Sequence, residues 1–144
     1  MINPKRLQNI LEDMEECLEN MEATIDALDK YDAFVHQRLL RSFRPEITGF
    51  KELLGEYISH CLKTISISVN ELTYLESVQK AIALGYIDQE DYLFLAKLTK
   101  LRNRTAHGYN RPTEEELIKF FCEHRENFYN MYKVIKKTKN ALEA

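Results

Sequence analysis

The sequence predicts an all-α fold, an up-and-down bundle of four long helices with one or two short ones, and three observations lead to this prediction. Apolar residues recur along most of the chain at intervals of three and four, the period of a helix with one buried face. Only four Gly and three Pro occur in 144 residues, too few for the many turns of a β-sandwich or barrel. No stretch of useful length alternates like a strand. The length fits a single domain, residues 1–144.

The first half of the chain is predicted to form three helices. Asn3 caps the first, with Pro4 at the first helical position, where its missing N–H costs nothing. A second helix covers about residues 32–44 and stops at Pro45, because the residue before a proline avoids helical angles. The third covers about residues 46–69 and carries the clearest apolar stripe.

The second half is predicted to hold a short helix and two longer ones. A connector at residues 70–73 precedes the short helix, which ends at Gly85. Asp88 caps the next helix, which runs into a basic segment. Thr113 and Glu116 form a capping box that opens one final helix. The apolar face of that helix consists of Leu117, Phe120, Phe121, His124, Phe128, Met131, Tyr132 and Ile135.

Composition and charge exclude several classes of protein. Hydrophobic residues at 44% and charged residues at 30% are typical of a folded soluble chain and disfavour disorder. No apolar run is long enough to cross a membrane and no apolar leader opens the chain, so we expect a cytoplasmic protein. The net charge of −3, with acids concentrated in residues 1–30 and arginines in residues 101–112, disfavours a general nucleic-acid binder. It allows a phosphate to be held at one place.

The cysteines and histidines do not form a metal-binding pattern. Cys17, Cys61 and Cys122 are odd in number and far apart, so we expect no disulfide framework and three reduced core residues. No His follows a Glu by three residues, which excludes the ligand pattern of di-metal bundles. The pairs His60–Cys61 and Cys122–His124 diverge around a helix and do not converge on one zinc ion. We therefore expect no metal and no cofactor.

One segment differs from the rest of the chain. Residues 102–109 read Arg-Asn-Arg-Thr-Ala-His-Gly-Tyr at the end of a helix, shortly before Pro112. Arg102 supplies a permanent charge suited to phosphate, and His107 supplies a group that titrates near neutral pH. On an ideal helix they lie about 140° apart, so they meet through the long arginine side chain, a local distortion or a second copy of the chain. The alternative interpretation is a solvated helix end, where basic groups favour the helix dipole.

This segment resembles the motif of the HEPN superfamily, in which an Arg and a polar residue precede a His by four to six residues. Arg102, Asn103 and His107 match that motif, and the added Tyr109 resembles the HepT branch, the toxin half of HepT–MNT toxin–antitoxin pairs. Residues 76–88, followed by the motif stretch at residues 101–110, are also similar to small nucleotidyltransferase-associated "substrate-binding" HEPN proteins. The resemblance covers about residues 46–135 and is only architectural before that, because the acidic first helix aligns with neither group.

The HepT resemblance implies a metal-independent endoribonuclease that cleaves RNA through attack of a 2′-OH on its own phosphate. His107 would act as general acid or base and Arg102 would stabilise the charge that develops on the phosphate. Asn103 and Arg104 would contact phosphate or orient a partner group. Each chain offers one suitable His, so we expect a two-fold homodimer to supply the second. The resemblance also implies that a partner nucleotidyltransferase antitoxin adenylylates Tyr109, which could instead be a packing aromatic.

Two other classes of function stay open at this point. The chain could be a non-catalytic partner that completes a minimal nucleotidyltransferase, with a nucleotide or substrate held in a groove at the motif segment. It could also be a purely structural helical dimer or adaptor. Cleavage of RNA without added metal would distinguish the ribonuclease from both.

Overall fold

The computed structural model describes residues 2–30, 32–107 and 111–144, except for the side chains of residues 102–107. Helices account for most of these residues, and none of the described residues forms a strand, which confirms the all-α prediction. None of the described helices combines the length and the apolar character that crossing a membrane requires. In chain order the α-helices are α1 (Pro4–Ala27), α2 (Ala33–Lys63), α3 (Tyr74–Ala83), α4 (Tyr92–His107), α5 (Glu114–Glu123) and α6 (Arg125–Glu143).

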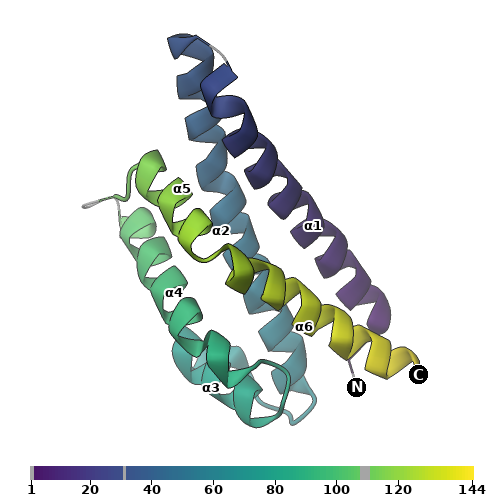
Figure 1. Ribbon diagram of the computed structural model, residues 1–144. Coiled ribbons are helices and arrows are strands. Elements are labelled where there is room, and N and C mark those ends of the chain that lie inside the picture. The colour runs from purple at the N-terminus through teal and green to yellow at the C-terminus, as the bar shows by residue number, and fades with distance from the viewer. Residues whose placement is uncertain (1, 31, 108–110) are drawn as a thin grey trace.

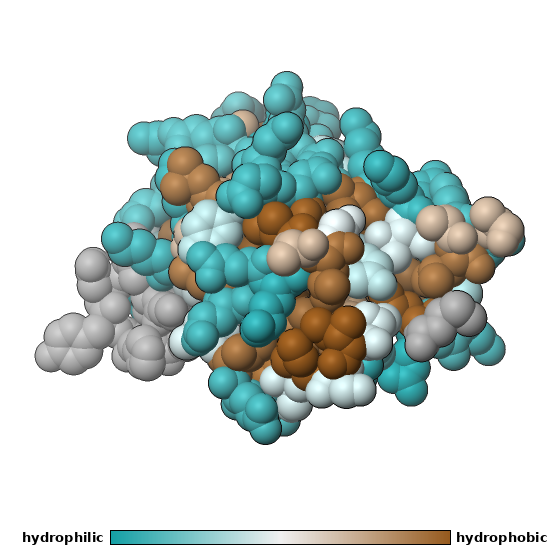
Figure 2. Space-filling view, turned by 90° about the horizontal axis from the view of Figure 1, so that it is seen from below, coloured by the Kyte–Doolittle hydropathy of each residue, from teal (hydrophilic) through white to brown (hydrophobic). Residues whose placement is uncertain are grey.

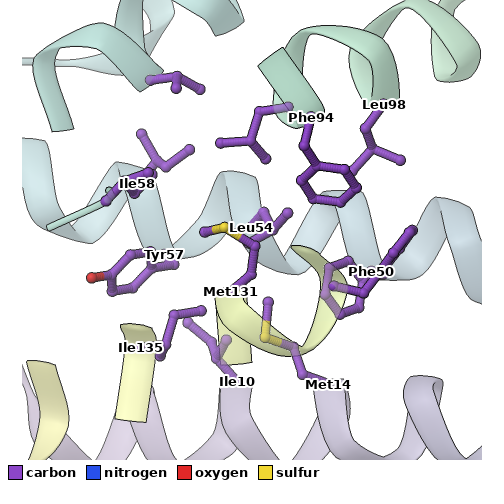
Figure 3. Packing of buried hydrophobic residues seen from close by; sticks show 14 of the residues in the cluster. Ile10, Met14, Phe50, Leu54, Tyr57, Ile58, Phe94, Leu98, Met131 and Ile135 are labelled. Carbon is purple, nitrogen blue, oxygen red and sulfur yellow. The ribbon is translucent and has the colours of Figure 1, made fainter. Parts of the chain in front are cut away.

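A continuous apolar core joins all six helices. Helices α1, α2 and α6 lie together, and α3, α4 and α5 also pack against α2 (Figure 1). The enclosed side chains include Met14 of α1, Phe50 and Tyr57 of α2, and Met131 and Ile135 of α6 (Figure 3). Each large apolar side chain that is fully buried contributes about 1.5–3 kcal/mol. The packing of these faces, more than helix propensity, holds the bundle together.

The acidic first helix is fixed at its start by a cap and near its end by α6. The Asn3 side chain accepts the backbone N–H of Lys5 at 2.9 Å, which confirms the predicted cap. Most acidic side chains of α1 are exposed, but Glu22 contacts α6. Its carboxylate lies 2.9 Å from Nη2 of Arg125 and accepts the Tyr129 hydroxyl at 3.2 Å. Part of the acidic charge therefore attaches α1 to α6.

Helix α2 is one continuous helix of 31 residues, so the predicted stop before Pro45 is wrong. Proline inside a helix removes one backbone hydrogen bond and crowds the preceding turn, at a cost of about 3 kcal/mol. Phe43 and Ile47, on either side of Pro45, are buried in the same core and offset that cost. Pro45 itself is exposed, so the carbonyl group that loses its partner, on Arg41, can bond to water.

The end of α2 differs from the prediction, and the end of α3 confirms it. Helix α2 ends at Lys63 and not near residue 69, because Ser66 adopts a left-handed conformation (φ +59°) that turns the chain. Ile65 is consequently 44% exposed and does not extend the buried stripe. Helix α3 ends as predicted before Gly85, whose φ of +84° suits a residue without a side chain.

His124 divides the predicted final helix into α5 and α6. Its backbone angles (φ −114°, ψ 20°) lie outside the helical region. The predicted capping box at the start of α5 is confirmed, since Thr113 accepts the N–H of Glu116 at 3.1 Å and Glu116 accepts the N–H of Thr113 at 3.4 Å. Asp88, in contrast, does not cap α4. It precedes a single 3₁₀ turn, Gln89–Asp91, and its side chain makes no capping bond there.

The three cysteines are free, but only two of them pack as predicted. Cys61 is buried and Cys17 is half-buried, whereas Cys122 is exposed because its neighbour Phe121 takes the inward position on α5. Burial raises the pKa of the Cys17 and Cys61 thiols to about 12. Both thiols are therefore protonated at neutral pH and are poor nucleophiles.

The surface carries few large hydrophobic side chains. Among the described residues, those that are exposed are Phe34, Ile65, Leu84 and Leu93, on different parts of the fold. Figure 2, which views the molecule from below, shows hydrophobic patches interspersed with hydrophilic side chains. Single exposed hydrophobic residues are common on folded proteins and need no special explanation.

Candidate functional site

Residues 102–107 of the segment singled out by its sequence form the last turns of α4, which stays helical to His107. The backbone positions of Arg102 and His107 therefore keep the separation of about 140° expected on an ideal helix. Asn103 precedes His107 by four residues and shares its face of the helix. The side chains of these three residues and of Arg104, and the whole of Tyr109, lie outside the described residues. A phosphate ligand must reach Arg102 and His107, so we predict that both are accessible in a cleft, and we predict that Tyr109 exposes its hydroxyl beside His107. Both expectations concern these undescribed side chains and stay predictions.

A cluster of aromatic rings holds the part of α4 that leads into the motif. The ring of Phe94 lies 5.0 Å from that of Phe128 and 6.0 Å from that of Phe120, measured between centroids. Leu98, one turn further along, is 1% exposed. Arg102 follows Leu98 by four residues, so its backbone position lies on the same side of α4 as this buried stripe. The core thus fixes the turns of α4 immediately before the motif.

Pro112, which follows the motif in the sequence, lies beside Arg44 of α2. Nη2 of Arg44 donates to the carbonyl oxygen of Pro112 at 2.6 Å and lies 3.4 Å from the Glu114 carboxylate. Its Nη1 is shielded from solvent and has no hydrogen-bond partner among the described residues. Because Arg44 is largely buried and opposed by Glu114, we assign it to anchoring the start of α5.

A basic hollow of about 280 Å³ lies between α4 and the junction of α5 with α6. Lys97 and Lys100 of α4 contribute the two ammonium groups, and His124 contributes an imidazole from the junction. Glu123 also lines it, but this exposed carboxylate lies 3.9 Å from a lysine one turn earlier on its own helix. The remaining lining is apolar and includes Phe120. We call this feature the α4 hollow.

The ring of His124 is fixed by aromatic contacts. Its centroid lies 4.6 Å from that of Phe120 and 5.7 Å from that of Phe94. Two ammonium groups beside an imidazole form a local positive field suited to an anion, such as a backbone phosphate of nucleic acid. The α4 hollow therefore adds positive charge one to two helical turns before the motif.

Sequence reasoning missed this hollow. Lys97 and Lys100 are three residues apart and share a face of α4, which is a detectable but common pattern. His124 follows His107 by seventeen residues and is predicted on the buried stripe of a continuous helix. The break at His124 places its ring against α4, and no Gly or Pro in the sequence announces that break.

A second polar cluster lies at the other end of α4 and is structural. Asp91 is 1% exposed and accepts hydrogen bonds from the side-chain amides of Asn127, at 3.1 Å, and Asn130. Burial raises the pKa of the Asp91 carboxyl, and the two amides only partly oppose this. These bonds tie the start of α4 to α6.

No group of three or more His, Cys, Asp or Glu among the described residues is arranged to hold a metal ion. Comparisons of the chain with protein-family models, with curated proteins and with solved structures found no match. The resemblance to the HEPN superfamily therefore depends on the motif residues themselves.

Proposed function

We propose that this chain is a metal-independent endoribonuclease, the toxin half of a toxin–antitoxin pair of the HepT–MNT kind. The observation that carries the proposal is the Arg-Asn-x-x-x-His-x-Tyr motif, which occupies residues 102–109 in an all-helical chain. The positive charge of the α4 hollow supports it, because an RNA substrate brings a chain of phosphates to the enzyme.

The proposed reaction needs only proton transfer, charge stabilisation and alignment from the protein. The 2′-oxygen forms a bond to phosphorus, the bond from phosphorus to the 5′-oxygen breaks, and one proton moves from the 2′-OH to a base while another reaches the leaving oxygen. His107 serves as base or acid, and Arg102 stabilises the negative charge at phosphorus. Asn103, on the same helix face as His107, orients it or contacts phosphate together with Arg104.

The proposed active site is shared between two copies of the chain. Two proton transfers call for two titrating groups, and Arg102 and His107 occupy different sides of one helix. A two-fold homodimer that pairs the two motif segments would supply a second His107 and a second Arg102.

Tyr109 is the proposed point of control. A nucleotidyltransferase antitoxin would transfer an adenylyl group from ATP to the Tyr109 hydroxyl, with release of pyrophosphate, and so block the site. Incubation with that enzyme and ATP, followed by mass spectrometry, should locate the added mass on Tyr109. Modification confined to other residues would count against the HepT assignment.

RNA cleavage in the presence of EDTA tests the proposed activity. We expect the wild-type chain to cleave and His107→Ala to lose at least about 100-fold in rate, the lower range for general acid–base catalysis. Arg102→Gln should lose activity as well, whereas Arg111→Gln, which removes the same charge just beyond the motif, should retain it. Nucleotide binding without cleavage by the wild-type chain would instead favour the non-catalytic partner of a nucleotidyltransferase.

The role of the α4 hollow has its own test. The double variant Lys97→Gln/Lys100→Gln should bind RNA more weakly, and its affinity should depend less steeply on salt, because fewer counterions are released. The matched control Lys136→Gln/Lys137→Gln on α6 removes two exposed lysines outside the hollow and should leave binding nearly unchanged. An equal effect of both changes would exclude a specific role for the hollow.

A further inference from the structure

A second basic hollow lies between the start of α1 and the end of α2. The start of α1 lies far from α5 (Figure 1). Its volume is about 290 Å³. The residues that line it are Ile2, Asn3, Arg6, His60, Lys63 and Thr64. We call it the α1–α2 hollow.

Its three basic side chains come from two helices that meet there. Arg6 belongs to the first turns of α1, and His60 and Lys63 belong to the last turn of α2. Arg6 and Lys63 are exposed and form no ion pair with any other described residue. The nearest acid to His60 is Glu56 on α2, whose carboxylate oxygen lies 3.9 Å from Nε2, beyond hydrogen-bond distance.

His60 has an unused hydrogen-bonding atom inside this cluster. Its side chain is only 11% exposed, and Nε2 is shielded from solvent with no hydrogen-bond partner among the described residues. A buried polar atom without a partner costs about 1–3 kcal/mol, so native proteins rarely keep one without a reason. A ligand that accepts a hydrogen bond from Nε2 would remove this cost.

We propose that the α1–α2 hollow binds a phosphate group between Arg6, Lys63 and His60. Two permanent cations match a phosphate, which carries a charge between about −1.5 and −2 at neutral pH, and protonated His60 supplies a third charge and a donor. The volume is at the lower end of about 300–1,000 Å³ typical of small-molecule sites, so it suits a phosphate group better than a whole nucleotide. This site is separate from the motif and does not depend on the proposed ribonuclease activity.

The titration of His60 reports on the site. Burial lowers the pKa of His60, and the positive charges of Arg6 and Lys63 lower it further, while Glu56 opposes them. An anion between these groups reverses the effect of the two cations and stabilises the imidazolium. Phosphate binding must therefore raise the pKa of His60, and by linkage protonation of His60 must strengthen the binding of a phosphate of given charge.

NMR titration of the His60 ring proton, assigned with a His60→Gln variant, tests the proposal in the full chain. We expect inorganic phosphate to raise the pKa of His60 by about one unit relative to sodium chloride at equal ionic strength, since an opposite charge at close range has an effect of this size. Arg6→Gln and Lys63→Gln should abolish this response. Lys5→Gln removes the neighbouring charge, does not line the hollow and should leave the response intact.

Titrations with AMP and with adenosine, compared with inorganic phosphate, identify the source of the phosphate group. A response to AMP at lower concentration than to inorganic phosphate, with none to adenosine, would identify a phosphate monoester as ligand. An equal or stronger response to inorganic phosphate would identify the free ion. No response to either, or the same response in Arg6→Gln, would overturn the proposal. The response should persist in His107→Ala, which separates this site from the proposed active site.

Discussion

Phe128 on α6 is the residue whose removal should weaken the bundle most. Its ring is fully buried, with centroids 4.8 Å from Phe50, 5.0 Å from Phe94 and 5.0 Å from Phe121, so it joins four of the six helices. Truncation of a core Phe to Ala costs about 3–5 kcal/mol, and aromatic pairs contribute about 0.5–1.5 kcal/mol each. We therefore expect Phe128→Ala to lower the free energy of unfolding by about 4–5 kcal/mol.

Urea unfolding followed by circular dichroism measures this loss, provided that the denaturant slope stays constant. Phe34→Ala is the matched control, because Phe34 is 70% exposed and its truncation should change stability by less than about 0.5 kcal/mol. A double-mutant cycle with Phe94→Ala should give a coupling energy of about 1 kcal/mol, the contribution of one aromatic pair. A loss below about 2 kcal/mol for Phe128→Ala, or no coupling to Phe94, would refute this description of the core.

Three other predictions concern the helix interior, a buried acid and assembly. Pro45→Ala should raise the free energy of unfolding, measured in urea, by about 2 kcal/mol, because it restores a helix hydrogen bond at an exposed position. Part of that gain is lost because the unfolded chain has more conformational freedom with Ala than with Pro. A destabilised variant would contradict this prediction. The raised pKa of Asp91 means that the folded state holds this proton more tightly, so wild-type stability should fall as the pH rises from about 3.9 through the folded pKa. The Asp91→Asn variant should lack this fall in stability. If stability falls with pH in the same way in the wild type and in the variant, Asp91 is excluded as the source. For the proposed homodimer, light scattering should give about twice the chain mass of 17.0 kDa. Sulfate should raise Tm more than chloride at equal ionic strength, because an anion relieves the repulsion between the paired Arg102 side chains. A monomer whose Tm shows no such anion effect would leave the shared site unsupported.

Most of the fold follows from local rules that the sequence displays. The cap at Asn3, the capping box at Thr113 and the glycine stop at Gly85 each depend on a few neighbouring residues, and all three are confirmed. Pro45 shows where local rules fail, because long-range packing of Phe43 and Ile47 outweighs a strong local stop signal.

The helix break at His124 and the early end of α2 at Lys63 have the same origin. Neither position carries a Gly or Pro that would mark it, and the apolar stripes continue across both. Tertiary packing determines where the chain turns, and the spacing of apolar residues in the sequence does not indicate these positions. The exposure of Ile65 follows from the early end of α2.

The candidate sites were predictable only as far as they are local in sequence. The Arg102–His107 motif is contiguous and can be identified directly. Both hollows combine residues from separate elements, so they become visible only when the packing is known: His124 meets Lys97 across a helix junction, and Arg6 meets His60 at the ends of two helices.

The most direct test of the proposed chemistry is cleavage of an RNA with a single 2′-deoxy nucleotide at a mapped cleavage site, in EDTA. Attack by the 2′-OH predicts that the all-RNA substrate yields a 2′,3′-cyclic phosphate end, that the deoxy substitution abolishes cleavage at that site alone, and that His107→Ala cleaves neither substrate there at an appreciable rate. Cleavage that persists at the deoxy nucleotide, or an unchanged rate in His107→Ala, would contradict the mechanism.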